Sequence, residues 1–146
     1  MSPVSHAIEV KVRWSEADPA GIVFYPRFFE WFDLATEALF ESLGLPWAEI
    51  FPKYRVVGVP IVESGARFAS PVRYGDQVRI RSSVTEVRAK TFRVEHDVSV
   101  GERPCAAGFE VRAWIALPEE PGGRLAAKPF PEEIAMRLKG QGGIYA

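Results

Sequence analysis

Residues 8–14 alternate between apolar and charged side chains. Ile8, Val10, Val12 and Trp14 are apolar, and a charged residue lies between each pair. This period of two is typical of a β-strand with one buried face. We therefore expect a strand over 8–14 that packs on a hydrophobic core.

A long helix is predicted from Pro26 to Leu43. Proline fits the first turn of a helix because it has no N–H to leave unpaired, and no further breaker occurs before Gly44. Apolar residues fill most of the helix surface, and the charged residues form one stripe: Glu30, Asp33, Glu37 and Glu41. At ~1.5 Å per residue such a helix runs about 27 Å, the length of a strand that could lie along it.

Most of the remaining chain has the pattern of strands. The alternating segments 78–85 and 92–100 predict a hairpin whose turn is Arg88-Ala89-Lys90. A further strand over 109–115 places Phe109, Val111, Ala113 and Ile115 on its apolar face. We also expect a bent strand over 56–72 that Pro60 and Gly65 interrupt, a turn over 47–51 and a short closing helix over 132–139.

These elements predict an α+β protein in which one long helix lies against five or six antiparallel strands. Such an open sheet has exposed edges and an uncovered outer face, which association with further copies of the chain would cover. The length of 146 residues fits a single domain over 1–146.

Charge and composition narrow the class of protein. Lys and Arg number 18 and Asp and Glu 19, so the net charge of −1 argues against a nucleic-acid binder with a broad basic face. The sequence has neither a signal-peptide pattern nor the ~20 apolar residues of a membrane span. Its single cysteine, Cys105, excludes an internal disulfide and fits a reducing compartment. We expect a cytoplasmic protein with no nucleic-acid partner and no membrane insertion.

The segment 15–21 holds the sharpest candidate for catalysis. Asp18 precedes Pro19, and Gly21 is free to adopt a positive φ, so a structured loop is predicted just before the helix. Backbone N–H groups at a helix start can stabilise an oxyanion, so a carboxylate that acts as nucleophile or base and an oxyanion hole could share this segment. Aspartate is also a common turn former, and the alternative is that Asp18 only caps the turn.

Other candidates have plainer alternatives. Arg88 and Lys90 flank the hairpin turn and, with Arg81, Arg93 and either Arg55 or Arg67, could form a basic patch suited to phosphates. Many such turns are charged only because they face water. His6 and His96 match no zinc spacing and have no nucleophile beside them in the sequence, so we expect structural roles and no metal site.

The run Asp18-Pro19-Ala20-Gly21-Ile22-Val23 resembles the 4-hydroxybenzoyl-CoA thioesterase branch of the hotdog-fold acyl-CoA thioesterases. Further matching pieces follow in order and extend the resemblance over residues 8–117: 44–46, 58–62, 74–76 and 88–92. The resemblance implies a sheet wrapped around a central helix, dimers that join their sheets, often dimers of dimers, and an active site between subunits. It also implies hydrolysis of an acyl-CoA, with no cofactor because coenzyme A is part of the substrate.

The resemblance assigns roles to seven residues. Asp18 matches the catalytic aspartate, and Tyr25 lies at the helix start whose backbone N–H polarises the thioester carbonyl. Arg88 and Lys90 match the turn that holds the coenzyme A phosphates. The remaining three match the acyl pocket: Val59 and Pro60 in a segment that the partner subunit offers, and Asp33 near the acyl end.

Two departures from the family pattern leave the acyl group open. Val59 stands where a hydroxyl-bearing residue is often found, and 27–29 is bulkier and more apolar than a phenol pocket would need. An apolar pocket discriminates weakly between close analogues, so benzoyl, other aryl and short aliphatic acyl groups all remain candidates. Asp33 is retained, which keeps a hydroxyl-bearing ring possible. A non-catalytic acyl-CoA-binding module is the alternative from another class, although such a module would not need Asp18.

Overall fold

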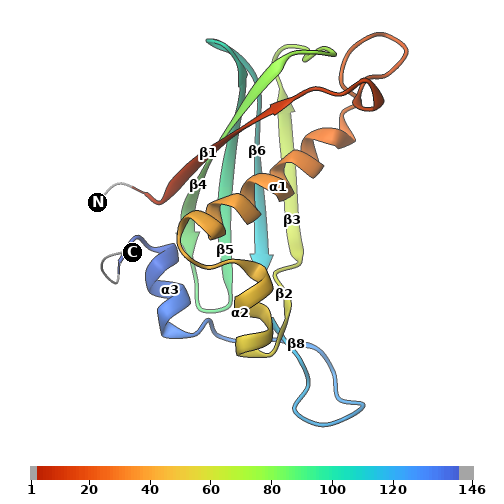
Figure 1. Ribbon diagram of the computed structural model, residues 1–146. Coiled ribbons are helices and arrows are strands. Elements are labelled where there is room, and N and C mark those ends of the chain that lie inside the picture. Colours follow the sequence, from red (N-terminus) through yellow and green to blue (C-terminus); the bar gives the residue numbers. More distant parts are fainter. Residues whose placement is uncertain (1–2, 142–146) are drawn as a thin grey trace.

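The computed structural model describes residues 3–141 and is built around a five-stranded antiparallel sheet (Figure 1). The strand order is β1-β4-β5-β6-β3. The bounds are β1 (Ser5–Lys11), β3 (Ile61–Phe68), β4 (Gln77–Val87), β5 (Thr91–Val100) and β6 (Arg103–Ala113). The predicted α+β class, the antiparallel sheet and the hairpin through the turn at 88–90 are confirmed.

Helix α1 (Pro26–Ser42) lies across one face of this sheet (Figure 1). Its 17 residues agree with the predicted helix, and Pro26 occupies the first turn as expected. Phe32, Leu39 and Phe40 expose no surface, because they pack between the helix and the sheet. Leu34, counted with the apolar surface in the prediction, is 49% exposed.

A second, smaller sheet and two short helices lie beyond the carboxyl end of α1 (Figure 1). The sheet has the order β2-β7-β8, with β2 (Val56–Gly58), β7 (Ile115–Ala116) and β8 (Ala126–Ala127). Helices α2 (Trp47–Tyr54) and α3 (Glu132–Leu138) pack on a core that includes Phe40, Phe92, Trp114 and Phe130. The predicted closing helix is therefore confirmed. None of the helices in residues 3–141 is long and apolar enough to cross a membrane.

Three local expectations are wrong. The expected turn over 47–51 is the start of α2, which buries Ile50. The expected bent strand over 56–72 is two strands in different sheets, separated at Gly58, which has φ 153°, and at Pro60, where an interruption was expected. Strand β3 continues through Gly65, where a second interruption was expected, and ends at Phe68. The first strand ends at Lys11, and Trp14 lies in a short 3₁₀ helix, η1 (Trp14–Glu16), where it is 76% exposed.

Candidate active site

The Asp18 carboxylate is held in a tight turn between η1 and α1. Its Oδ1 accepts a hydrogen bond from the Ala20 N–H at 2.8 Å, and the Gly21 N–H donates to the Asp18 carbonyl at 2.9 Å. Gly21 has φ +81°, the conformation for which glycine was expected here. The half-buried Asp18 thus has one oxygen fixed by the backbone, and within residues 3–141 its Oδ2 has no hydrogen-bond partner.

Glu16 fastens this turn to the long helix. One carboxylate oxygen accepts a hydrogen bond from the Trp31 ring Nε1 at 2.8 Å, and the other accepts one from the Arg13 N–H at 2.8 Å. The Phe24 N–H donates to the Glu16 carbonyl at 2.9 Å, and the Val23 N–H to the Val72 carbonyl at 2.7 Å. The chain is therefore fixed on both sides of Asp18, at Glu16 and at residues 23–24, which limits the positions open to the Asp18 side chain.

The Tyr25 N–H lies directly before helix α1. The next two N–H groups are paired, since Arg27 donates to the Phe24 carbonyl and Phe28 to the Tyr25 carbonyl, and Pro26 has no N–H. In the described part of the chain the Tyr25 N–H has no acceptor. The positive end of the helix dipole lies at this point, so the group can donate to a negatively charged oxygen.

The basic turn lies between β4 and β5, with Arg88 and Lys90 exposed. Arg88 forms an ion pair with Glu86 and lines a surface depression together with Arg93. Arg81 belongs elsewhere, because it is seven positions back along the chain in β4, about 23 Å at ~3.3 Å per residue. Arg55 lines a separate depression, and Arg67 lines one that Arg93 also borders. The patch expected from the sequence is therefore smaller than the full set of arginines.

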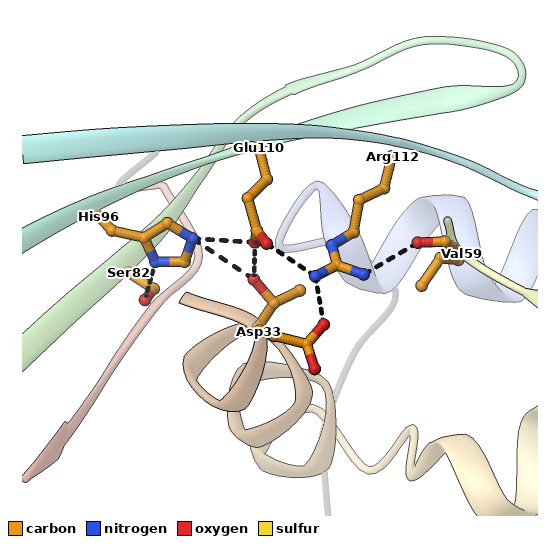
Figure 2. Close-up of polar contacts among 7 residues, drawn as sticks. Asp33, Val59, Ser82, His96, Glu110 and Arg112 are labelled. Atoms are coloured by element: carbon orange, nitrogen blue, oxygen red, sulfur yellow. Dashed lines mark hydrogen bonds and ion pairs between the residues drawn. The ribbon is translucent and has the colours of Figure 1, made fainter. Parts of the chain in front are cut away.

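Two of the three expected acyl-pocket residues, Asp33 and Val59, meet at Arg112 of β6 (Figure 2). Arg112 Nη1 donates to the carbonyl of the buried Val59 at 3.0 Å, and Nη2 donates to Asp33 Oδ1 at 2.6 Å. The exposed Pro60 follows, and its carbonyl accepts a hydrogen bond from the Ala113 N–H at 3.1 Å. Neither the position nor the role of Arg112 is apparent from the sequence pattern.

A buried polar network continues from Arg112 into the core (Figure 2). Nη2 of Arg112 also donates to Glu110 Oε2 at 2.7 Å, and His96 Nε2 lies 3.0 Å from Glu110 Oε1. His96 Nδ1 pairs with the Ser82 hydroxyl at 2.7 Å, and Thr36 donates a short hydrogen bond to Glu110. Burial alone would raise the pKa of Glu110, but the hydrogen bond from His96 and the charge and hydrogen bond of Arg112 outweigh it and lower the pKa.

The burial of this network has two consequences. Ser82, His96 and Glu110 have at most 1% of their surface exposed, so they cannot meet a substrate as a hydrolytic triad. The prediction that His96 is structural agrees with its burial, and its ring stacks on Phe32 with centroids 4.6 Å apart. The inward face of β6 over 109–112 is also opposite to the one predicted, because Glu110 and Arg112 are buried whereas Phe109 and Val111 are partly exposed. Ala113 is buried, as predicted.

A single chain places the Asp18 loop at one end of the sheet and the Val59 segment and the basic turn at the other. The Asp18 loop pairs with residues 72–73, just beyond the end of β3, whereas Val59 precedes the start of β3. The eight residues of β3 span about 26 Å at ~3.3 Å per residue. Arg88 and Lys90 lie at the Val59 end, because the Lys90 carbonyl accepts a hydrogen bond from the Trp114 N–H. One chain therefore does not bring Asp18 together with the Val59 segment or the basic turn.

Metal-binding side chains are not grouped in this site. Within residues 3–141, three or more His, Cys, Asp or Glu side chains nowhere lie in an arrangement suited to a metal ion. The sole cysteine, Cys105, is buried.

The fold and the sequence together define the class of protein. The α+β arrangement is that of the hotdog fold, and the family model described as "Thioesterase-like superfamily" matches residues 12–138. The chain belongs to this superfamily, whose enzymes cleave thioesters.

Individual relatives agree with this assignment. The 4-hydroxybenzoyl-CoA thioesterase of Pseudomonas sp. strain CBS-3 is 34% identical over 96 residues, 65% of this chain and 68% of the relative. A 1,4-dihydroxy-2-naphthoyl-CoA hydrolase of Synechococcus sp. strain CC9311 is 30% identical over 126 residues, 77% of this chain and 83% of the relative. The solved structure of a gentisyl-coenzyme A thioesterase superposes with a TM-score of 0.78 at 34% identity, over 88% of this chain and 98% of that one.

Proposed function

We propose that this acyl-CoA thioesterase hydrolyses an aromatic acyl-CoA of the benzoyl or 4-hydroxybenzoyl type to the free acid and coenzyme A. The observation that carries the proposal is the pairing of two groups in one fixed loop. The Asp18 carboxylate has an oxygen without a partner in the described part of the chain, and the Tyr25 N–H at the start of α1 has no acceptor there.

Two routes from this pair to the products are chemically complete. In the first, Asp18 Oδ2 attacks the thioester carbon, the C–S bond breaks to release the coenzyme A thiolate, and water then hydrolyses the acyl-aspartyl anhydride. In the second, Asp18 takes a proton from a water molecule, whose oxygen attacks the same carbon to give a tetrahedral intermediate. The C–S bond then breaks, the coenzyme A thiolate takes up the proton from Asp18, and the free acid remains. Both routes need an ionised Asp18 and place negative charge on the carbonyl oxygen. The Tyr25 N–H stabilises that charge, and loss of such a donor costs ~10²-fold or more in rate.

The complete site requires a second chain. Strand β3 is an edge of the five-stranded sheet, and it exposes Ile61, Val62 and Phe68 by 44%, 60% and 50%. Exposed apolar edges promote pairing with another strand. A two-fold axis at this edge makes the two β3 strands antiparallel, so the Asp18 loop of one chain approaches the Val59 segment of the other. A dimer of dimers would extend this arrangement.

The same two-fold axis brings the basic turn of one chain to the Asp18 loop of the other. Arg88 and Lys90 would hold the phosphates of coenzyme A, and Arg93 lies in the same surface depression as Arg88. Lys128 lies at the same end of the sheet as the basic turn, because its N–H donates to the Trp114 carbonyl. We expect no further cofactor, since coenzyme A arrives with the substrate, and we expect a cytoplasmic location.

Asp33 favours a hydroxyl-bearing aromatic acyl group over an aliphatic one. Its side chain is 55% exposed, and its carboxylate can accept a hydrogen bond from a ring hydroxyl. The three relatives described above are named for acyl groups that are hydroxylated aromatic rings. An aliphatic acyl chain offers no donor to Asp33 and would leave this carboxylate without a partner from the substrate.

Release of free thiol from 4-hydroxybenzoyl-CoA, benzoyl-CoA and butyryl-CoA tests the proposal. We expect the wild-type protein to give the highest kcat/KM with one of the two aromatic substrates. A preference for butyryl-CoA would overturn the aromatic assignment and favour a short-chain thioesterase. Binding of all three without thiol release would identify a non-catalytic acyl-CoA-binding module.

A further inference from the structure

Arg112 joins three groups that belong to different parts of the chain. Its guanidinium donates to the Val59 carbonyl from the β2–β3 connection, to Asp33 from the middle of α1, and to Glu110 on its own strand. The distances are 3.0, 2.6 and 2.7 Å. Only 5% of the Arg112 side chain is exposed, whereas 55% of the Asp33 side chain is exposed. A buried cation is therefore directed at an exposed carboxylate.

Stability alone does not account for this arrangement. Burial of an ion pair such as Arg112 and Glu110 carries a desolvation cost that its attraction barely repays, and apolar side chains of similar size serve a core equally well. Nε of Arg112 is buried without a hydrogen-bond partner in the described part of the chain, which adds to the cost. What the arrangement provides is geometry, because the guanidinium fixes the Val59 carbonyl and the Asp33 carboxylate at set positions.

We propose that Arg112 is a positioning residue that sets the acyl end of the substrate pocket. By holding Asp33 Oδ1, it fixes the carboxylate and leaves Oδ2 available to a hydroxyl group on the acyl ring. By holding the Val59 carbonyl, the same guanidinium fixes the backbone of the segment that enters the partner's pocket. The inference rests on the proposed function, and it assigns selection of hydroxylated rings to a residue that does not touch the substrate.

The network behind Arg112 makes its position rigid. Glu110 is held by Arg112 through Oε2 and by His96 and Thr36 through Oε1, and Ser82 fixes His96 in turn (Figure 2). The Phe32 ring stacks on His96 as well. The five residues behind Arg112 are each at most 1% exposed: Glu110, His96, Thr36, Ser82 and Phe32. A planar guanidinium can donate to Val59, Asp33 and Glu110 at once because its N–H groups diverge in one plane. A lysine ammonium at this position keeps the charge but cannot reproduce that fork.

Arg112→Lys separates positioning from simple stabilisation. In the variant we expect kcat/KM for 4-hydroxybenzoyl-CoA to fall about ten- to a hundred-fold, because the hydrogen bond to the ring hydroxyl loses its alignment. We expect kcat/KM for butyryl-CoA, which has no hydroxyl, to change less than about threefold. The decisive readout is the ratio of the two values. A loss of stability alone would lower both values together and leave that ratio unchanged.

Two further variants complete the experiment. Arg79→Lys makes the same substitution at an exposed position on β4, outside the site. It should leave kcat/KM unchanged for both 4-hydroxybenzoyl-CoA and butyryl-CoA. If Arg112→Lys does not fold, as judged by circular dichroism and thermal unfolding, the double variant Arg112→Gln with Glu110→Gln removes both buried charges and is expected to show the same fall in the ratio.

The outcomes distinguish this inference from the proposed function. If the wild type releases no thiol from any acyl-CoA, the proposed function fails and the inference fails with it. If the wild type is active but the folded Arg112 variant has an unchanged substrate ratio, the inference alone is overturned. A ratio that falls by at least about tenfold, with Arg79→Lys unchanged, supports the positioning role.

Discussion

Gly108 of β6 allows α1 to approach the sheet, and Gly108→Ala tests this contact. A Cβ at this position would lie 2.4 Å from Cε2 and 2.6 Å from Cζ of Phe32, and 3.0 Å from the Gly65 carbonyl oxygen. Phe32 has no exposed surface, and its ring stacks on His96 at an interplanar angle of 3°. The ring therefore cannot move aside without giving up this stack.

The expected cost follows from two opposing effects. Overpacking a filled core costs about 1–3 kcal/mol, whereas replacing glycine by alanine in a strand returns about 0.5–1 kcal/mol of backbone entropy. The midpoints of the two ranges leave a net loss of about 1 kcal/mol, which lowers Tm by about 2–4 °C for a chain of this size. Asp33 directly follows Phe32, so a displaced ring also disturbs the acyl end of the site.

Thermal and urea unfolding of a double-mutant cycle measures the contact. Phe32→Leu removes the ring atoms that Gly108→Ala would meet, so the double variant should lose less stability than the sum of the two single variants. Stability of Gly108→Ala equal to that of the wild type, or strict additivity in the cycle, would refute the packing argument.

Three further predictions concern the buried network, the basic turn and the sheet edge. The lowered pKa of Glu110 means that its carboxylate contributes stability above the unfolded pKa of about 4.3 and loses it as pH falls through the folded pKa. In urea unfolding, Glu110→Gln should therefore lose less stability than the wild type between about pH 5 and 3, and parallel curves would contradict this. Replacing Arg88 and Lys90 by Gln should raise KM for acyl-CoA roughly tenfold and weaken the salt dependence of that KM. The KM for acyl-pantetheine should not change, and an equal rise in KM for both substrates would exclude phosphate binding. Val62→Lys on the β3 edge should give a monomer in sedimentation and abolish activity, and an active monomer would disprove the shared site.

Local patterns in the sequence predicted much of the fold. Helix α1 follows from the proline at position 26, the uninterrupted apolar surface and the glycine at position 44. The β4–β5 hairpin follows from strict alternation on both sides of a charged turn. The Asp18 loop could likewise be expected, because its geometry depends on neighbours within a few residues: Ala20, Gly21 and Ile22.

The inward face of β6 could not be predicted in this way. Glu110 and Arg112 alternate with Phe109 and Val111, and the apolar pair was the natural choice for the core. The charged pair is buried instead because each charge finds partners from other elements: Thr36, His96, Asp33 and Val59. Those partners are 14 to 79 positions away in the sequence, so no local pattern brings them together.

The second sheet was missed for a similar reason. Strands β2, β7 and β8 have only two or three residues each, too few for an alternation to be recognised. They form because β2 pairs with β7, which lies far from it in the sequence, and both strands pack around Trp114. The shared site is beyond the reach of both the sequence and a single chain, since Asp18 and Val59 lie at opposite ends of β3.

The central claim is that the Asp18 carboxylate cleaves the thioester. Single-turnover thiol release from the best aromatic acyl-CoA by Asp18→Asn, with binding of the intact substrate measured in parallel, tests it most directly. Asp76→Asn is the matched control, because Asp76 also accepts a backbone hydrogen bond in a turn, from the Arg73 N–H at 2.8 Å. We expect Asp18→Asn to bind the substrate, to keep the wild-type Tm and to lose at least about 10²–10⁴-fold in rate, with Asp76→Asn active. A folded Asp18→Asn variant that cleaves acyl-CoA at the wild-type rate would contradict the assignment.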